Sequence, residues 1–454
     1  MEPRIVPARN TDREYCPSLS ASGQAMLDFL REHPAAPIYR NQSGNRLLAD
    51  EVAQLRDFER EVLCSTVGWP KEGQPHWLGE FVARTYAEVP HFRAMGMPPS
   101  RFEDIPTLTR ADLAADIAPF VPDTADVERL INFRTTGTTG TPLLIASHPR
   151  VAGSYLAFHK RALRRFGVEP GHGRGQVGVV LIGMQRKCFT YVSVTPVMDE
   201  SGLAKINLHP DDWRDPLDRV RYLEALQAEI ISGDPISFAE LLNLPVKLRP
   251  RALISVSMML STGLRQRLEA RFACPVLDLY SLNEVGPVAV FDPSLNGHLL
   301  LQPRLYVEIL DTEGQPVNAG ERGEITFTGG FNFCLPLLRY RSGDFASLTR
   351  TPEGPVLHAF SGRQPVRFRT LGGGCLNNID VTHVLRPLAL TQYGVHQHVD
   401  GSVRLRLTRA DMALARKATE LLCTLFEEQR ITVDEIALDD KILQYSSDIP
   451  QAIE

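Results

Sequence analysis

The chain has 454 residues, which is long for one hydrophobic core and predicts at least two domains. Its composition, 43% apolar and 23% charged, is that of an ordinary globular protein, and its net charge of −5 gives no general attraction to nucleic acid or anionic membranes. Seven scattered cysteines form no C-x-x-C pair, residues 1–16 are no secretory signal, and no apolar run approaches the ~18 residues of a membrane span. We therefore expect a cytoplasmic protein with reduced thiols, no membrane partner and no nucleic-acid partner.

The first hundred residues predict a helical lead-in. Apolar side chains recur at helical spacing from Ser22 to Arg101, whereas residues 1–20 are irregular. Thr109 then stands as a helix N-cap, with Asp112 three positions later, where a capping box places an acidic residue. We expect a helix to begin directly after Thr109.

The next segment is dense in threonine and glycine. Residues 135–142 read Thr-Thr-Gly-Thr-Thr-Gly-Thr-Pro and lie between two apolar runs, 130–133 and 143–146. Glycine lets backbone N–H groups turn inward around an anion, and threonine hydroxyls add further donors. The pattern predicts a strand, a phosphate-binding turn and a second strand. It is no Walker A loop, because the lysine and the spacing of that motif are absent, and a polar surface turn is the alternative.

Strands and helices are expected to alternate from residue 150 to residue 280. We expect helices over 150–166, 217–231 and 264–272, and short apolar strands over 176–184, 252–260 and 276–280. Such alternation is typical of parallel βαβ units, which bind ligands at the carboxyl ends of their strands.

From about Leu300 the pattern changes. Short alternating runs at 306–310 and 324–327 predict antiparallel hairpins. After Arg363, a strand at 403–407 and an amphipathic helix at 410–429 predict a small α+β unit.

Two acidic residues stand where they could carry chemistry. Glu284 follows a predicted buried strand, so its carboxylate would lie at the strand end, where Mg²⁺ could bridge it to a phosphate oxygen. Asp344 lies in a tight turn, and a carboxylate there could accept two hydrogen bonds from vicinal ribose hydroxyls. The alternatives are a solvated loop acid for Glu284 and, for Asp344, a structural ion pair with the neighbouring arginines.

In this order and spacing, the segments resemble the adenylate-forming (ANL) superfamily, in its phenylacetate–CoA ligase-like branch. The matching motifs are residues 135–142 for the phosphate loop, Tyr280–Glu284 for Y-G-x-T-E, Arg339–Asp344 for R-Y-R-T-G-D, and Gly362-Arg363 with Gly372 for the hinge element. The lead-in segments 89–92 and 105–113 and the turn 233–235 also fit that branch. The resemblance covers roughly residues 78–408.

The resemblance implies an α/β fold of two parts. These are a large N-terminal domain over residues 1–361, with mixed and parallel sheets flanked by helices, and a small mobile α+β C-terminal domain over 362–454. It also implies a two-step reaction, in which a carboxylate attacks the α-phosphate of ATP to give an acyl-adenylate and pyrophosphate. The thiol of coenzyme A or of a carrier protein then displaces AMP.

The same resemblance implies roles for individual residues. The β- and γ-phosphates of ATP would be held by Thr135, Thr136, Gly137, Thr138, Thr139 and Gly140. Glu284 would bind Mg²⁺, Tyr280 would pack on adenine, Asp344 would hold the ribose hydroxyls, and Arg363 would lie near the ribose or the phosphates. Positioning and charge neutralisation supply most of the catalysis in attack at phosphorus.

Several positions depart from the family pattern. Asn283 replaces the usual Thr or Ser, although its amide can still donate to an α-phosphate oxygen. Pro365 and Val366 stand where the family has one or two acidic residues and its hinge, and proline fixes φ. The late Gly-Lys element is absent, and Lys441 is the best candidate for its lysine. These departures leave adenylation better supported than thiol transfer.

An aryl or arylacetic acid is the substrate class that branch membership favours. Phe189 and Tyr191 could line an aromatic slot for it, with Gly263 assigned to the same pocket, although aromatic side chains at this spacing are often core.

Two further hypotheses stay open. The activated species could meet a small amine or another nitrogen nucleophile, in the extreme case with nitrite activated and an arylamine as acceptor. The protein could also be a nucleotide-binding homologue that has lost catalysis. The sequence leaves open whether the helical lead-in forms a homodimer.

Overall fold

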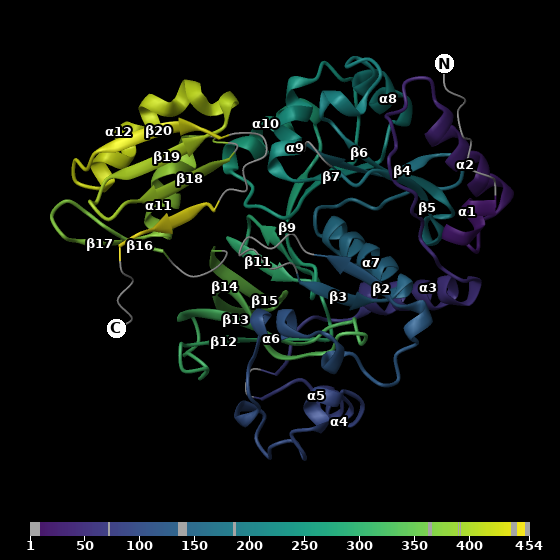
Figure 1. The fold of residues 1–454 in the computed structure, drawn as a ribbon, viewed down its shortest axis with the longest axis horizontal. Coiled ribbons are helices and arrows are strands. Elements are labelled where there is room, and N and C mark those ends of the chain that lie inside the picture. Colours follow the sequence, from purple (N-terminus) through teal and green to yellow (C-terminus); the bar gives the residue numbers. More distant parts are fainter. Residues whose placement is uncertain are drawn as a thin grey trace. The chain divides into compact units, whose positions relative to one another are not determined.

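The computed structural model describes residues 10–70, 73–134, 143–184, 188–361, 366–388, 390, 392–436 and 443–449 (Figure 1). Two compact units divide the chain. We call them the first unit, residues 1–64, 149–258 and 267–278, and the second unit, residues 65–148, 259–266 and 279–454.

A largely parallel sheet forms the centre of the first unit. Its strand order is β5 (Tyr191–Thr195), β6 (Ser201–Asn207), β4 (Val177–Gly183), β7 (Ile230–Gly233), β8 (Ala252–Ser255) and β9 (Val276–Leu282). All neighbours pair in parallel except β5 and β6. Every residue of β7 and β8 is buried, which is why these strands have continuous apolar sequences instead of alternating ones. The predicted βαβ organisation is confirmed, although β8 ends at Ser255 instead of residue 260.

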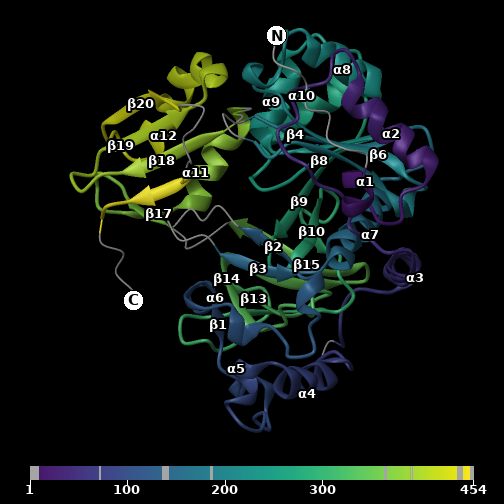
Figure 2. The ribbon, with the colours of Figure 1, turned by 45° about the vertical axis from the view of Figure 1, so that its right-hand side comes forward.

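Along the chain, helices precede and connect the strands of this sheet. The helices with residues in the first unit are α1 (Asn10–Tyr15), α2 (Ala21–Glu32), α3 (Ala49–Cys64), α7 (Pro149–Arg165), α8 (Asp218–Leu226), α9 (Pro235–Asn243) and α10 (Thr262–Phe272). α7 confirms the helix expected over 150–166, whereas α8 ends at Leu226, before the predicted end at residue 231. Helices α3 and α7 are both labelled in the ribbon of Figure 2. They pack through the edge-to-face pair Phe58–Phe158 and the ion pair Glu59–Lys160.

An antiparallel sheet dominates the second unit. Its order is β9, β10 (Gly286–Asp292), β11 (Gly297–Leu300), β15 (Gly354–Ser361), β14 (Leu337–Thr351), β13 (Arg322–Gly329) and β12 (Leu305–Leu310). β9 is shared, because residues 276–278 belong to the first unit and residues 279–282 to the second. The hairpin expected from runs 306–310 and 324–327 is confirmed as the β12–β13 pair.

Short elements edge this sheet. They are β1 (Leu108–Thr109), α4 (Leu78–Glu88), α5 (Pro90–Arg93) and α6 (Arg110–Ala115). β1 pairs in parallel with β14, so that Leu108 is opposite Tyr340. The predicted capping box is confirmed: the Thr109 hydroxyl accepts from the Asp112 N–H, and the Asp112 carboxylate accepts from the Thr109 N–H at 2.7 Å.

A separate hairpin flanks the threonine- and glycine-rich segment. β2 (Ile131–Arg134) and β3 (Leu144–Ser147) pair in antiparallel, and Arg134 is opposite Leu144. The predicted strands on either side of the segment are therefore confirmed. Residues 135–142 themselves lie outside the described residues.

The C-terminal residues build a small α+β layer with its own core. The strand order is β20 (Ile431–Glu435), β19 (Val403–Leu407), β18 (Tyr393–Gln397) and β21 (Tyr445–Ser447), with β16 (Arg367–Arg369) and β17 (Cys375–Asn377) as a separate pair. Helices α11 (Asn378–Leu385) and α12 (Ala415–Leu425) pack with the strands around the buried Phe368, Leu405 and Phe426. β19 confirms the expected strand. The helix expected over 410–429 is shorter than predicted, because residues 409–414 form a 3₁₀ helix and the α-helix ends at Leu425.

The expected domain boundary between residues 361 and 362 stays a prediction.

The remaining 3₁₀ helices are Phe102–Asp104, Ala118–Phe120, Val127–Arg129, Pro196–Met198, Pro210–Asp212 and Arg386–Leu388. In the described part of the chain, no helix is both long enough and apolar enough to cross a bilayer.

Candidate functional site

Glu284 lies on the tight turn between β9 and β10, at the end of the strand, as predicted. Leu282 is paired with Gly286, whose φ of +83° a residue with a side chain rarely adopts. The Glu284 side chain is 5% exposed. A glutamate this buried is not the solvated loop acid of the alternative hypothesis.

Two side chains hold one oxygen of this carboxylate. The hydroxyl of Tyr340 donates to Glu284 Oε1 at 2.7 Å, and Arg110 Nη1 lies 3.8 Å from the same oxygen. Burial, and then the negative charge of Glu284, raise the pKa of Tyr340 well above its usual value. The phenol therefore keeps its proton and acts as a hydrogen-bond donor. Arg110 is the first residue of α6, the helix that the Thr109 cap begins. The lead-in motif therefore places a cation beside Glu284.

Asp344 is held by a second tyrosine. The hydroxyl of Tyr280 donates to Asp344 Oδ2 at 2.7 Å, and the Tyr280 ring packs against Phe360 with centroids 4.4 Å apart. Burial, and then the nearby Asp344 carboxylate, raise the pKa of Tyr280 well above its usual value. Tyr280 thus connects β9 to the part of β14 that carries Asp344. Its packing on adenine stays a prediction.

Asp344 lies within β14, at an irregularity in its pairing with β13, and not in the predicted tight turn; the backbone there is fixed by its own polar groups. Ser342 Oγ accepts from the Asp344 N–H at 3.1 Å and donates to the Ile325 carbonyl at 2.7 Å. Gly343 has a φ of +77°, and its N–H donates to Glu324 Oε1 at 2.9 Å. The backbone around the carboxylate is therefore held before any ligand binds.

The two arginines of this motif, on β14, pair with glutamates on β12 and β13. Arg339 Nη2 lies 3.2 Å from Glu308, and Arg341 Nε donates to Glu324 at 2.6 Å. Arg339 also donates to the carbonyls of Glu103 and Ile105, and its side chain is 3% exposed. Burial raises the pKa of Glu308, and the charge of Arg339 opposes that rise. These ion pairs connect β14 to β12 and to β13.

The carboxylate of Glu284 has the chemistry of a magnesium ligand. Oε1 has the two partners described above, whereas Oε2 accepts no hydrogen bond from any described residue. Carboxylate oxygens are the ligands that Mg²⁺ prefers, and this ion usually takes one or two of them together with phosphate oxygens and water.

The residues that directly follow the predicted phosphate loop belong to the apolar core that contains Tyr280 and Tyr340. Leu143 and Ile145, which follow the loop, are fully buried in one apolar cluster with Tyr280 and Tyr340. Asn332 Nδ2 adds a buried hydrogen bond to the Ala146 carbonyl at 3.0 Å. Leu143 and Ile145 thus share one apolar core with the two tyrosines that bind Glu284 and Asp344.

The other predicted residues are distributed differently. Asn283 is exposed on the turn beside Glu284, and Gly263 is buried at the start of α10. Phe189 and Tyr191 belong to the first unit, where their rings lie 5.6 Å apart. Phe189 is 50% exposed, so it is a surface residue and not core. The residues outside the described part of the chain are Thr135, Thr136, Gly137, Thr138, Thr139, Gly140, Arg363 and Lys441.

Sequence reasoning missed two residues of the site. Tyr340 and Arg110 both contact Glu284, yet neither had been given a role. Tyr340 lies inside the R-Y-R-S-G-D motif, and Arg110 directly follows the predicted cap. Their positions within motifs were the available signal, but only the β1–β14 pairing shows that both segments meet at the β9–β10 turn.

Comparison with known proteins agrees with this geometry. Residues 130–333 match the family model described as AMP-binding enzyme. The chain is 25% identical over 289 residues to the phenylacetate-coenzyme A ligase of Escherichia coli (strain K12), covering 58% of this chain and 63% of that protein. It is 23% identical over 309 residues to the enzyme of the same name from Thermus thermophilus, covering 61% and 65%. The chain thus spans less than two thirds of the length of these curated relatives.

Solved structures share the fold. A 2-hydroxyisobutyryl-CoA ligase in the postadenylation state, in complex with R3-HIB-AMP, gives a TM-score of 0.58 at 16% identity, with 88% of this chain and 89% of that chain covered. An open conformation of a 2-hydroxyisobutyryl-CoA ligase, in complex with 2-HIB-AMP and CoA, gives 0.54 at 17% identity, with 77% and 90% covered. These similarities establish the α/β architecture with its small C-terminal α+β sheet. The match over residues 130–333 and the two phenylacetate-coenzyme A ligases support the resemblance of this chain to the adenylate-forming (ANL) superfamily, in its phenylacetate–CoA ligase-like branch.

Proposed function

We propose that this protein is an AMP-forming ligase that activates a small aromatic carboxylic acid with ATP and then transfers the acyl group to coenzyme A. The observation that carries the proposal is the pair of buried tyrosines that hold two acids in one core. Tyr340 fixes Glu284, and Tyr280 fixes Asp344, each through a 2.7 Å hydrogen bond. The relatives named phenylacetate-coenzyme A ligase support the same reaction.

In the first step a carboxylate oxygen of the acid attacks the α-phosphorus of ATP. A new P–O bond forms, the bond between the α- and β-phosphates breaks, and pyrophosphate leaves. A magnesium ion bound through Glu284 Oε2 would neutralise charge on the phosphates, and the threonines and glycines of residues 135–140 would position them. Asn283, exposed beside Glu284, would donate its amide to an α-phosphate oxygen.

Asp344 would orient the nucleoside. Its carboxylate would accept hydrogen bonds from the ribose hydroxyls, which are stronger than neutral ones because the acceptor is charged. Tyr280 and Ser342 already fix the segment of β14 on which it lies, so little ordering is required when ATP binds. Arg363 would assist near the ribose or the phosphates.

In the second step the thiol of coenzyme A, after losing its proton, attacks the carbonyl carbon of the acyl-adenylate. A C–S bond forms, the bond to the phosphate oxygen breaks, and AMP leaves. The solved ligase in complex with 2-HIB-AMP and CoA supports this acceptor over a nitrogen nucleophile. Residues 362–454 would act as the small mobile domain, consistent with the separate core around Phe368 and Phe426.

An aromatic acid is the substrate class that the chain supports best. Phe189 presents an exposed ring beside Tyr191, and such a pair can stack on a third ring. The phenylacetate named for the relatives points to the same class.

Exchange of labelled pyrophosphate into ATP tests the first step directly. We expect Mg²⁺-dependent exchange with at least one member of a panel of benzoic, cinnamic and phenylacetic acids. With that acid and coenzyme A, a thioester should form in equal amount to AMP. ATP binding without exchange for any acid would identify an inactive homologue, and a product with an amine in the absence of coenzyme A would contradict the thiol acceptor.

A further inference from the structure

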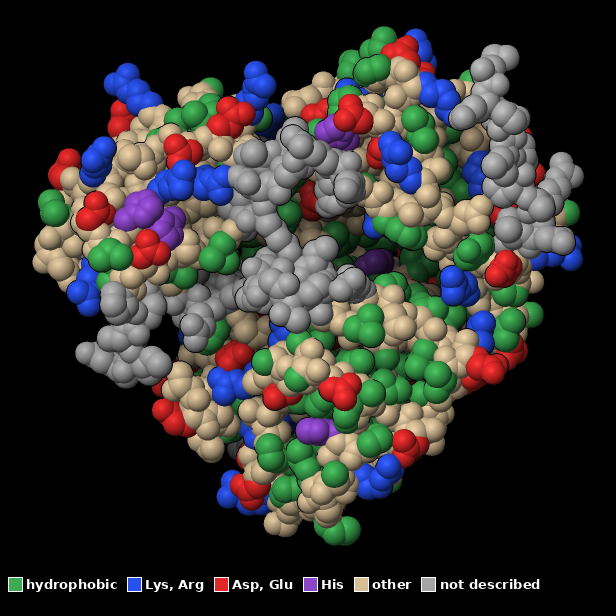
Figure 3. All heavy atoms as spheres, viewed as in Figure 1, with side chains coloured by type: hydrophobic (Ala, Val, Ile, Leu, Met, Phe, Trp, Pro, Cys, Tyr) green, Lys and Arg blue, Asp and Glu red, His purple; other side chains and the backbone are tan. Residues whose placement is uncertain are grey.

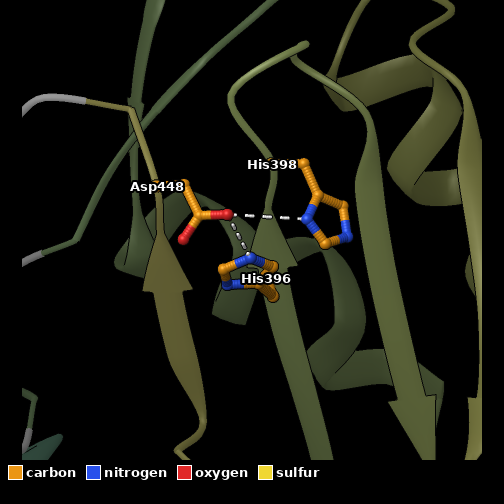
Figure 4. A group of neighbouring side chains, drawn as sticks. All are labelled: His396, His398 and Asp448. Carbon is orange, nitrogen blue, oxygen red and sulfur yellow. Dashed lines mark hydrogen bonds and ion pairs between the residues drawn. The ribbon is translucent and has the colours of Figure 1, made fainter.

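Two histidines and an aspartate converge at the edge of the small C-terminal sheet (Figure 4). His396 Nε2 lies 3.0 Å from Asp448 Oδ2, and His398 Nδ1 lies 3.5 Å from the same oxygen. One ligand atom from each of the three residues falls within 4.8 Å of the others. Figure 3 shows histidine side chains beside an acidic side chain on the surface of this part of the chain. A solvated ion could therefore reach the cluster.

The strand sequence puts both histidines on one face. His396 and His398 are two residues apart at the end of β18, and side chains at this spacing point the same way. Gln397 between them is fully buried. Its side chain accepts from the Arg369 N–H at 2.8 Å and donates to the carbonyls of Arg369 and Gly401. The backbone that carries the two imidazoles is therefore fixed from the opposite side.

Asp448 is brought to the histidines by the C-terminal strand. β21 pairs in parallel with β18, and Ser446 is opposite His396. The Asp448 N–H donates to the Gln397 carbonyl at 2.8 Å, which fixes the backbone of the carboxylate against the residue between the two histidines. The three side chains thus come from backbone segments that hydrogen bonds already connect.

The spacing fits a small divalent metal ion. Zinc binds imidazole nitrogen and carboxylate oxygen at about 2.0–2.2 Å, so two ligand atoms of a tetrahedral site lie about 3.3 Å apart. The distances from His396 Nε2 and His398 Nδ1 to Asp448 Oδ2, 3.0 and 3.5 Å, are close to that value. Two nitrogens and one oxygen leave the fourth position for water, as in other zinc sites with three protein ligands.

Ser446 supplies the outer partner that a ligating histidine requires. Its Oγ lies 2.8 Å from His396 Nδ1. If Nδ1 carries the proton and donates to this hydroxyl, Nε2 faces Asp448 with its lone pair free to bind a metal. Such outer hydrogen bonds orient most metal-binding histidines.

We propose that His396, His398 and Asp448 bind one divalent transition-metal ion, Zn²⁺ in the first place, and that this ion fastens β21 to β18. β21 has only three residues and pairs at the edge of the sheet. A metal bond across these strands stabilises the folded C-terminal segment, because the unfolded chain holds no preformed site. This site is independent of the adenylation chemistry.

Metal titration of the full chain, made without a polyhistidine tag and freed of metal by a chelator, tests the proposal. We expect calorimetry to show one tight Zn²⁺ per chain. Asp448→Asn and the more exposed His398→Ala should weaken this binding at least about 100-fold, and Ser446→Ala about tenfold. The matched control is His76→Ala, an exposed histidine in the second unit, which should bind as the wild type does. Circular dichroism of each variant checks that it folds.

Two further readouts decide between this site and other metal-binding groups. Co²⁺ in the site should give the visible bands of a tetrahedral ion without a thiolate charge-transfer band, since no cysteine takes part. Amide exchange in residues 445–448 should slow at least about tenfold when Zn²⁺ is added, and not in His398→Ala. Wild-type affinity in the His398 and Asp448 variants, a thiolate band, or unchanged exchange in residues 445–448 would overturn the proposal.

Discussion

The hydroxyl of Tyr340 donates to Glu284 across 2.7 Å, in a core where the tyrosine is fully buried and the glutamate almost so. This bond joins the R-Y-R-S-G-D motif, residues 339–344, to the motif Tyr280–Glu284. Two motifs that are 56 residues apart along the chain thus act on the same carboxylate. The contact fixes one oxygen of the Glu284 carboxylate.

Glu284→Gln should abolish Mg²⁺-dependent adenylation. The amide keeps the shape and can still accept from Tyr340, but the negative charge that would bind the metal is lost. We expect pyrophosphate exchange to fall at least about 100-fold, with an unchanged circular dichroism spectrum. Glu229→Gln is a matched control, because Glu229 is also buried but binds the Gly171 and His172 N–H groups in the first unit. Retained exchange in Glu284→Gln would refute the metal assignment.

Tyr340→Phe separates the support of Glu284 from its charge. The ring is conserved, but a buried carboxylate loses a hydrogen bond, which should cost about 1.5–3 kcal/mol of unfolding free energy. Because Glu284 keeps its charge and Arg110, exchange should persist at about a tenth of the wild-type rate. Urea unfolding and the exchange assay measure the two effects. Loss of exchange as complete as in Glu284→Gln would show that Tyr340 itself takes part in the reaction.

Much of the fold could be predicted, because its strands carry their own pattern. The buried run that becomes β4, the capping box at Thr109 and the hairpin β12–β13 all follow from local periodicity. The ends of elements were less predictable. The helix expected to reach residue 429 ends at Leu425, because Glu427 and Glu428 adopt positive φ angles of +56° and +70°, which do not continue a right-handed helix.

The candidate site was predictable where a motif names the residue, and not where a distant strand supplies the contact. The turn predicted for Glu284 is present, whereas Asp344 lies in β14 instead of a turn, and no spacing in the sequence indicates that Tyr340 and Tyr280 would bind the two acids. The expected ion pairs also differ in detail. Arg339 and Arg341 pair with Glu308 and Glu324, a choice that strand register alone determines.

Lys441→Ala tests the residue assigned to the late catalytic lysine. If its ammonium touches the α-phosphate and the carboxylate in the first step, adenylation should slow by well over tenfold, because a charge that stabilises the transition state is lost. Lys417→Ala, on helix α12, is the control for loss of another lysine from residues 362–454. Equal exchange rates in the two variants would identify Lys441 as a bystander.

Arg339→Lys and Asp344→Asn should affect stability and nucleotide binding separately. Lysine cannot replace the forked contacts of Arg339 with Glu308 and the Ile105 carbonyl, so we expect a loss of about 2–4 kcal/mol in unfolding free energy. Asparagine at 344 still accepts from Tyr280 but lacks the charge for the ribose, so the KM for ATP should rise about tenfold or more. Urea unfolding and exchange kinetics measure the two. A raised KM in Arg339→Lys at full folding would contradict the structural role.

His298 should make the second unit less stable in acid. It lies between the rings of Phe291 and Phe360, and burial, followed by the charges of Arg265 and His358, lowers its pKa to about 3. An unfolded histidine titrates near about 6.5. As the pH falls below that value, the unfolded chain takes up a proton that the folded chain refuses, so the unfolding free energy decreases.

The size of this effect can be measured against a variant that does not titrate. Between pH 7.5 and 5 the wild type should lose about 1–2 kcal/mol more than His298→Gln, since each pH unit below the unfolded pKa is worth up to about 1.4 kcal/mol. His76→Gln, exposed in the same unit, should keep the wild-type pH dependence. Urea unfolding at several pH values gives the slopes. Parallel slopes for the wild type and His298→Gln would mean that the folded protein accepts the proton, and that the aromatic neighbours do not exclude it.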